Sequence, residues 1–296
     1  MKKCAFDYEL QNDLTCLTNT YTNFVKQNGY EKRLNKMYLS NLKEKIFDRS
    51  LSEISDDKKL ITCLNAHSFN VAQDDKFFQY ALQNSDIILP DGIAIVYAIR
   101  YLHGIKLKKI SGYNLFYYEM EQLNKKHGSC FFLGSCESTN CHIELLAANE
   151  FPNIRTGSYS PPFKEEFSEE DSRRMLNEIN AFNPDVLFIG MTAPKQEKWA
   201  ATYFNDLHAR HICCIGAVFD FYARNILRAP GWMIYLGFEW LHRFLSEPRR
   251  LWRRYLIGNP KFVAKILLEK WLINRKPPLK NHPVTSKELS HRVIQN

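Results

Sequence analysis

The sequence lacks the glycine-rich phosphate loops that mark two large classes of α/β enzymes. Neither GxGxxG nor GxxxxGK[ST] occurs, so a dinucleotide-dependent dehydrogenase or epimerase and a Walker-type ATPase have no support. Cysteine pairs of the CxxC type are absent, and no histidine spacing suits zinc. We therefore interpret the 8 cysteines as reduced thiols, and we expect no metal site and no cofactor.

Long apolar runs are missing as well. The longest uncharged apolar stretch near the C-terminus covers residues 229–238, about half of the roughly 20 residues that a membrane-spanning helix needs. Residues 1–13 contain two lysines but no apolar run, which argues against a secretory signal peptide. We therefore expect a cytoplasmic protein whose membrane contact is peripheral.

Acidic residues are scarce in one segment only. Between positions 224 and 280 there are 13 Lys and Arg residues against 3 Asp and Glu, while the other 239 residues carry a net charge of about −2. The net charge of +8 therefore belongs to one cationic surface near the C-terminus. Such a surface suits nucleic acid, anionic lipid or a phosphorylated substrate.

Apolar strands alternate with helical patterns in a composition that is 45% apolar and 24% charged. Strands are predicted at residues 60–64, 87–89, 129–133, 185–189 and 211–215, and the last three are closed by Gly134, Gly190 and Gly216. Helices are predicted at residues 39–48, 71–84, 93–102, 114–126, 139–150, 169–181 and 195–204. This alternation predicts an α/β fold with a mostly parallel sheet, helices on both faces and ligands beyond the carboxyl ends of the strands.

Polar residues follow the first two strands. Asp91 comes just after the second strand, where a carboxylate can act as a general base, but aspartate is also a common helix N-cap and both roles stay open. Asn65 and His67 occupy alternate positions after the first strand and point the same way, into one crevice. A lone histidine is more often structural, so a structural role stays open for His67.

The loop after Gly190 is a candidate anion site. Glycine lets the backbone approach a ligand, Pro194 suits the first turn of the next helix, and free N–H groups there attract an anion. The alternative is an ordinary strand-to-helix turn with a solvated Lys195 and Glu197.

Residues 247–256 carry arginine and apolar side chains on separate arcs of a predicted helix. At 100° per residue, one arc of about 140° holds the arginines and the opposite arc holds the apolar residues. The arginines are Arg249, Arg250, Arg253 and Arg254, and the apolar residues are Leu251, Trp252, Tyr255 and Leu256. Guanidinium forks suit phosphate or diphosphate oxygens, and a solvated basic face is the alternative.

Seven stretches, in their order along the chain, resemble the WecG/TagA/CpsF glycosyltransferases. They are TCLNAHS (62–68), LPDGI (89–93), APKQE (193–197), FDF (219–221), RAP (228–230), LGFEWL (236–241) and EPRRLWRRY (247–255). The resemblance spans about residues 59–262, and the combination is highly specific although each piece alone is weak.

The resemblance implies an inverting, metal-independent enzyme. It would move a sugar, typically N-acetylmannosamine or its uronic acid, from a UDP donor to a polyprenyl-diphosphate-linked sugar in teichoic acid, enterobacterial common antigen, capsule or exopolysaccharide synthesis. The implied organisation is a variable N-terminal extension (1–57), a Rossmann-like core (58–223), a basic appendage (224–280) and a polar tail (281–296). The appendage would complete the active site at the inner face of the cytoplasmic membrane. A homo-oligomer is left open.

Site residues are also implied by the resemblance. Asp91 corresponds to the catalytic base, Asn65 to a substrate-pocket asparagine and Gln196 to the glutamine of the nucleotide-side loop. The residues taken as diphosphate-binding are Arg243, Arg249, Arg250, Arg253 and Arg254. The substrate-binding set is completed by His67, Asn114, Gly134 and Gly190.

The sequence departs from the family pattern at Cys63, Asn114 and Arg224, which stand where threonine, aspartate and glycine are common. None of these departures removes the base, so we expect an active enzyme.

A second hypothesis comes from another class of protein. The basic segment suits a membrane- or nucleic-acid-associated binding protein with an inert α/β core, and charge alone does not discriminate the two kinds of partner. An RNA-binding surface needs aromatic side chains among its basic groups, whereas Trp252 and Tyr255 are predicted opposite the arginines. We therefore expect no nucleic-acid partner.

Overall fold

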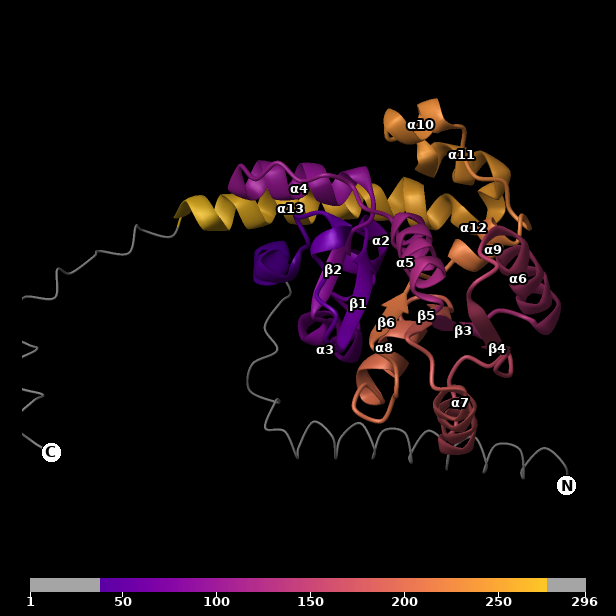
Figure 1. Ribbon diagram of the computed structural model, residues 1–296. Helices are drawn as coiled ribbons and strands as arrows, with labels where there is room; N and C mark the ends of the chain where they lie inside the picture. Colours follow the sequence, from indigo (N-terminus) through magenta and orange to yellow (C-terminus); the bar gives the residue numbers. More distant parts are fainter. Residues whose placement is uncertain (1–37, 276–296) are drawn as a thin grey trace, which may run out of the picture.

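The computed structural model describes residues 38–275, so the predicted polar tail and most of the predicted N-terminal extension lie outside the described residues. Its centre is a wholly parallel six-stranded sheet in the order β2-β1-β6-β5-β3-β4 (Figure 1). The strands are β1 (Lys59–Leu64), β2 (Ile87–Pro90), β3 (Ser129–Gly134), β4 (Arg155–Tyr159), β5 (Val186–Gly190) and β6 (His211–Cys214). The predicted α/β fold is confirmed.

Strand β4 was not predicted from the sequence. It lies at the sheet edge beside β3, and its side chains are exposed or half-buried, so its sequence RTGSY carries no apolar run. The other strands are buried on both faces and therefore read as continuous apolar stretches.

Helices cover both faces of the sheet, as predicted. On one face, α5 (Gly112–Lys126), α6 (Glu137–Glu150) and α9 (Val218–Tyr222) share a core with Phe132 and Phe188. On the other face, α7 (Glu169–Phe182) and α8 (Lys195–Thr202) pack against the alternate residues of the same strands. Because successive side chains of a strand point to opposite faces of the sheet, each apolar strand contributes side chains to a core on either face.

The single helix predicted at residues 71–84 is wrong. The structure has two helices, α2 (Ala66–Val71) and α3 (Lys76–Asn84). Asp75 separates them because its side chain accepts a hydrogen bond from the backbone N–H of Phe78 and so caps a new helix. The spacing of apolar residues suggested one continuous helix, but the cap by Asp75 starts a separate second helix.

The N-terminal part of the described chain packs against strand β2. Its short 3₁₀ helices are η2 (Leu39–Lys45) and η3 (Leu51–Glu53), in place of the longer helix predicted at residues 39–48. After η2, Ile46 bridges to Ile88, and the N–H of Phe47 donates to the Ile88 carbonyl at 2.9 Å. This segment therefore adds to the edge of the sheet.

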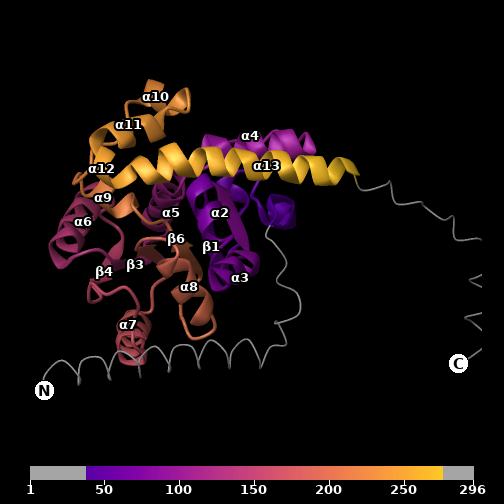
Figure 2. The same cartoon turned by 180° about the vertical axis from the view of Figure 1, so that it is seen from behind.

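The basic segment forms a chain of helices at the other end of the sequence. They are α10 (Gly231–Tyr235), α11 (Glu239–Ser246), α12 (Pro248–Trp252), the π-helix η4 (Arg253–Ile257) and α13 (Gly258–Arg275). In both views α13 runs beside α4 (Ile93–His103), and it also packs on α2 (Figure 2). We call residues 224–275 the appendage. Between residues 38 and 275, no helix has both the length and the hydropathy to cross a bilayer.

Candidate active site

Asp91 lies where the carboxyl ends of β1 and β2 meet. Its backbone N–H donates to the carbonyl of Leu64, at the end of β1, at 2.9 Å. Gly92, with φ 125°, then turns the chain into α4 and occupies the N-cap position, and no side chain caps this helix. The N-cap role considered for Asp91 is therefore wrong, and its carboxylate stands at the edge where ligands bind in parallel sheets.

The surroundings of Asp91 make it a stronger base than an ordinary aspartate. The pKa of Asp91 is raised to about 6, chiefly by burial and secondly by the negative charge of Glu239. The positive charges of Lys109, Arg243 and Arg254 oppose this rise. A carboxyl group with this pKa is mostly ionised at pH 7 and close to the range that suits a general base.

Asn65 and His67 flank the same edge. The side chain of Asn65 caps α2 by accepting hydrogen bonds from the backbone N–H groups of His67 and Ser68, each at 3.0 Å. A Cβ on Gly92 would lie 3.7 Å from the Cβ of Asn65, which places Asn65 beside the turn of Asp91. Burial, and then the charge of Arg254, lower the pKa of His67 to about 4. His67 is thus neutral at pH 7, and substrate contact by either residue stays a prediction.

Asn114 caps the helix that starts next to β2. Its side-chain oxygen accepts hydrogen bonds from the backbone N–H of Ser111 at 3.0 Å and from the Ser111 hydroxyl at 2.6 Å. The N–H of Ile110 donates to the carbonyl of Pro90 at 3.2 Å, so this helix start lies beside the strand that leads to Asp91. The side chain is exposed, and its predicted contact with a sugar stays untested.

The structure accounts for Gly134 and Gly190 through protein packing. The two residues pair across β3 and β5, and a Cβ on Gly134 would lie 2.6 Å from the carbonyl oxygen of Gly190. A Cβ on Gly190 would lie 2.4 Å from the ring of Phe219. Both glycines are needed for close packing at the carboxyl edge, and their approach to a ligand stays a prediction.

Gln196 is buried and joins two loops at this edge. Its side-chain oxygen accepts hydrogen bonds from the N–H groups of Met191 at 3.2 Å and Gly216 at 3.1 Å. Its amide nitrogen donates to Glu197 at 2.8 Å. The interpretation of Glu197 as solvated is wrong: it is 1% exposed, and burial raises its pKa to about 7. Gln196 therefore holds the loops after β5 and β6 together, and its predicted nucleotide contact stays untested.

Two of the predicted arginines are close enough to Asp91 to influence its pKa. Arg243 on α11 and Arg254 on η4 both lower the pKa of Asp91 through their charges, and the Arg243 guanidinium lies 5.2 Å from the centroid of the Phe221 ring. Arg254 is only partly exposed, and its Nε, buried from solvent, has no hydrogen-bond partner among the described residues. The positive charges of these two guanidinium groups act on the carboxylate, and guanidinium groups can bind an anion.

The remaining predicted arginines are exposed. Arg249, Arg250 and Arg253 lie on the solvent side, with Arg250 paired to Glu247. The predicted complete segregation of arginine and apolar arcs is wrong, because Trp252 is also exposed while Arg254 turns toward the core. For Arg254 the cause is the π-helix that begins at residue 253, since its wider turn changes the angle between successive side chains; Trp252 lies before it, at the end of α12.

Three charged residues of this region were missed by the sequence interpretation. Glu239 at the start of α11 pairs with Lys109 at 2.5 Å and with Arg228 at 3.7 Å. Arg228 lies in the RAP motif and Glu239 in the LGFEWL motif, so membership of these motifs could have marked both residues as candidate site residues. Nothing in the sequence around Lys109 distinguishes it from other surface lysines.

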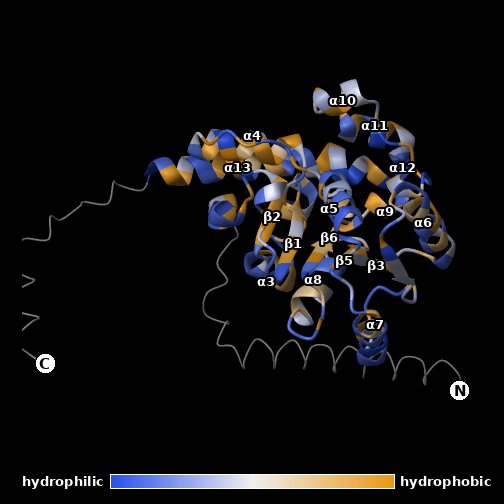
Figure 3. Cartoon of the chain, viewed as in Figure 1, coloured by the Kyte–Doolittle hydropathy of each residue, from blue (hydrophilic) through white to orange (hydrophobic). Residues whose placement is uncertain are grey.

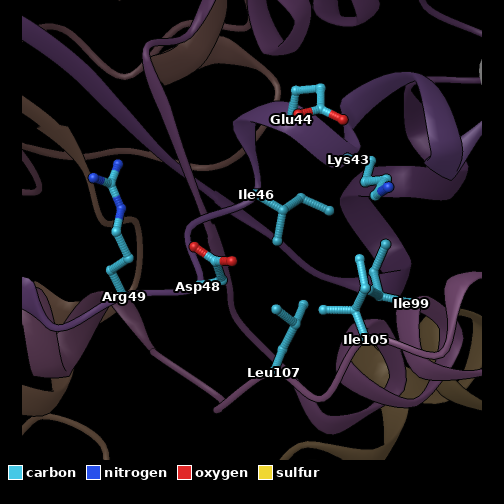
Figure 4. Close-up of a pocket in the computed structure, with 8 residues that line it drawn as sticks. All are labelled: Lys43, Glu44, Ile46, Asp48, Arg49, Ile99, Ile105 and Leu107. Carbon is cyan, nitrogen blue, oxygen red and sulfur yellow. The ribbon is translucent and has the colours of Figure 1, made fainter.

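A hollow of about 290 Å³ lies away from these residues. Apolar side chains of Ile46, Ile99, Ile105 and Leu107 point into it, and its rim carries charged groups of the segment around η2 (Figure 4). None of the predicted site residues lines it. Among residues 38–275, no group of three or more His, Cys, Asp and Glu side chains is arranged to hold a metal ion.

A parallel α/β sheet with a carboxylate of raised pKa at the carboxyl edge of its strands is compatible with an enzyme that binds its substrate there. Sequence comparison gives the family. The profile of the glycosyl transferase WecG/TagA/CpsF family matches residues 33–276, so the chain belongs to this family and is a glycosyltransferase.

Two relatives illustrate the similarity. The N-acetylglucosaminyldiphosphoundecaprenol N-acetyl-beta-D-mannosaminyltransferase of Bacillus subtilis (strain 168) is 30% identical over 210 residues, which cover 71% of this chain and 79% of that protein. The protein of the same name from Staphylococcus aureus (strain MRSA252) is 24% identical over 221 residues, 75% of this chain and 84% of that protein.

Proposed function

We propose that this enzyme transfers an N-acetylmannosamine-type sugar from a UDP donor to a polyprenyl-diphosphate-linked acceptor sugar, in the synthesis of a cell-surface polysaccharide. The observation that carries the proposal is that Asp91, at the carboxyl edge of the sheet, has a raised pKa and lies within the electrostatic influence of Arg243 and Arg254. The names of the two relatives support the sugar and the lipid-linked acceptor. Family membership favours this enzyme over a binding protein with an inert core.

The proposed reaction is a single displacement with inversion. Asp91 takes the proton of the attacking acceptor hydroxyl, whose oxygen forms a bond to the anomeric carbon of the donor sugar. The bond between that carbon and the β-phosphate oxygen breaks, and UDP leaves with the electron pair. One general base suffices for this step, and such a base contributes about 10²- to 10⁴-fold in rate.

The leaving diphosphate needs compensation of its developing negative charge. We assign this role first to Arg254 and Arg243, whose charges act on Asp91, and then to the exposed Arg249 and Arg250 of α12 and Arg253 of η4. Guanidinium groups held in place before the reaction stabilise such charge electrostatically. The same groups support the proposal that the enzyme needs no divalent metal.

The lipid-linked acceptor places the proposed reaction at a membrane surface. Large apolar side chains are exposed along the appendage and on the neighbouring α4, and the appendage is also rich in Lys and Arg. Hydrophilic and hydrophobic residues alternate along α4 and α13 (Figure 3). The exposed large apolar residues are Tyr97, Tyr101, Trp232, Tyr235, Leu236, Phe238, Leu245, Trp252, Leu256, Ile257, Val263, Leu267, Leu268 and Trp271. Aromatic and basic side chains together suit the interface of an anionic bilayer, so we propose peripheral binding through this surface.

The proposal is tested by supplying the pure enzyme with a panel of UDP-sugars and a lipid-diphosphate-linked N-acetylglucosamine, and by following UDP release. Asp91→Asn is expected to retain UDP binding and the fold but to lower turnover by about 10² to 10⁴. Asp74→Asn is the matched control, because Asp74 is an exposed aspartate that pairs only weakly with Lys261, at 3.6 Å.

Two results would overturn the proposal. Absence of UDP release with every donor removes the UDP-sugar assignment. Turnover by Asp91→Asn equal to that of Asp74→Asn removes Asp91 from the mechanism, and proton transfer must then be assigned to another group.

A further inference from the structure

Glu239 holds the start of α11 against the core of the enzyme. Its carboxylate lies 2.5 Å from the Nζ of Lys109, in the segment before α5, and 3.7 Å from the Nε of Arg228, at the start of the appendage. The side chains of Glu239 and Lys109 are only 20% and 18% exposed. Ion pairs that are partly shielded from water hold their partners more firmly than exposed pairs do.

Two further contacts fix the same part of the appendage next to Asp91. A Cβ on Gly237 would lie 3.3 Å from the side chain of Ile93, the first residue of α4. The guanidinium of Arg228 lies 3.9 Å from the centroid of the Tyr113 ring, in the first turn of α5. The start of α11 is therefore seated on the beginnings of the two helices that flank Asp91.

The charges around Asp91 come from three separate segments. Lys109 belongs to the segment before α5, Arg254 to η4, and Glu239 and Arg243 to α11. Cys63 on β1 adds no charge, because burial, and then the charge of Asp91, raise the pKa of its thiol well above the usual value. His67 is likewise neutral at pH 7. Glu239 is thus the negative charge that acts on Asp91 most strongly.

We propose that Glu239 is a positioning residue that links the docking of α11 to the protonation of Asp91. When α11 is seated, the same helix brings the carboxylate that strengthens the base and the arginine that meets the leaving group. The inference rests on the role of Asp91 in the proposed function. It assigns Glu239 no contact with substrate.

The test measures the protonation of Asp91 directly, without substrate. The full chain is labelled with ¹³C at the side-chain carboxyl carbon of aspartate, and the Asp91 signal is identified by its loss in Asp91→Asn. The pH midpoint of this signal is then compared between wild type, Glu239→Gln and Lys109→Met. A thermal melt of each variant verifies that it is folded.

The expected shifts have opposite signs. Glu239→Gln removes a negative charge, which favours the ionised form of Asp91, so its midpoint should fall by at least about 0.5 pH unit. Lys109→Met removes a positive charge and should raise the midpoint, and the double variant should lie between the two. Asp74→Asn removes a carboxylate from another ion pair between core and appendage, with Lys261, and should leave the midpoint unchanged. The acid limb of the pH profile of kcat/KM should move with each midpoint.

Equal midpoints in wild type and Glu239→Gln would overturn the inference, as would shifts of the same sign in Glu239→Gln and Lys109→Met. Lys109→Met provides an independent reading if Glu239→Gln proves unstable. Because the titration needs no turnover, a failure of the proposed reaction is seen separately, as absence of UDP release from wild type.

Discussion

The carboxylate of Glu269 accepts a hydrogen bond from the backbone N–H of Leu39 at 2.9 Å, although 230 positions separate the two residues. The same carboxylate accepts from the N–H of Ser40 at 2.8 Å and from its hydroxyl at 2.5 Å. The Ser40 hydroxyl is also 3.0 Å from the Nε2 of His103, at the end of α4. One buried acid thus ties η2, α4 and α13 together, and α13 continues from the turn that carries Arg254.

We predict that Glu269→Ala destabilises the folded enzyme by about 2 to 4 kcal/mol, because partly buried N–H donors lose their acceptor. Denaturant unfolding of the purified variants measures this difference. Glu53→Ala is the control: Glu53 accepts a similar bond from the N–H of Ser50, but the bond is exposed, so its loss should cost about 1 kcal/mol or less. Equal losses in the two variants would contradict a special role of Glu269.

The buried pair of His211 and Glu119 predicts a pH dependence of stability. Burial lowers the pKa of His211, but the hydrogen bond to Glu119, at 2.8 Å, the charge of Glu119 and the bond to the Ser55 carbonyl together outweigh burial and leave the pKa raised. A raised folded-state pKa gives stability that is fully present below the unfolded value of about 6.5 and is lost as pH rises through the folded value. The free energy of unfolding lost in Glu119→Gln should therefore be larger at pH 5.5 than at pH 8.5.

The control for this pair is Glu121→Gln, which changes an exposed glutamate on the same helix. Its effect on the free energy of unfolding should be small at both pH values. If the loss in Glu119→Gln is independent of pH, His211 is not protonated in the folded state and the assignment of the pair fails.

Buried strands were predictable because burial on both faces leaves an apolar run in the sequence. The strands that end in Gly134 and Gly190 are of this kind, whereas the edge strand β4 has half-exposed polar residues and was missed. The division of residues 66–84 into two helices depends on the cap by Asp75, which competes with apolar periodicity. Local hydrogen bonds of this kind are weak signals in sequence.

Site residues that directly follow a strand could be predicted from the sequence, whereas those that are positioned by tertiary contacts could not. Asp91 and Asn65 come directly after strands, and parallel strands end at one edge. The pairing of Lys109 with Glu239 joins residues 130 positions apart, for which periodicity gives no information. The inward turn of Arg254 depends on a π-helix, whereas the prediction assumed a regular α-helix.

The enzyme should keep its transferase activity after treatment with EDTA and removal of the chelator. In the proposed mechanism, Arg243 and Arg254 supply the positive charge that a divalent ion would otherwise provide. UDP release from treated and untreated enzyme, with and without added Mn²⁺, measures this. Loss of activity that Mn²⁺ restores would contradict metal independence.

The arginines should differ in their tolerance of lysine. Arg254→Lys and Arg243→Lys are expected to lower kcat by at least about tenfold, because lysine retains charge but cannot donate as a planar fork to diphosphate oxygens. Arg249→Lys should have a smaller effect, since Arg249 is exposed on the solvent side. Arg275→Lys, at the exposed end of α13, is the control. UDP release in detergent measures all four, and equal activity of the four variants would remove the arginines from leaving-group stabilisation.

Membrane binding and sugar transfer should be separable by single side chains of the appendage. Removal of the whole appendage does not separate them, because Phe262 and Ile266 of α13 are buried in the core with α2 and α4. We therefore predict that replacing the exposed Trp232 and Tyr235 by serine weakens binding to anionic vesicles by at least about tenfold, which corresponds to the loss of about 1.4 kcal/mol of apolar contact. The same double variant should keep its turnover in detergent, where binding to a bilayer no longer matters.

Arg254→Lys should show the converse behaviour, with vesicle binding retained and turnover in detergent lowered, because the proposed reaction uses the guanidinium of Arg254 whereas lysine keeps only its charge. Phe163→Ser is the control for loss of an exposed aromatic ring, since Phe163 is fully exposed but lies outside both α4 and the appendage. Vesicle sedimentation and UDP release, measured on the same preparations, give the two readings. If the double serine variant loses turnover in detergent as strongly as Arg254→Lys does, the exposed apolar side chains act in substrate binding rather than in membrane attachment, and the acceptor lipid itself must then contact α10.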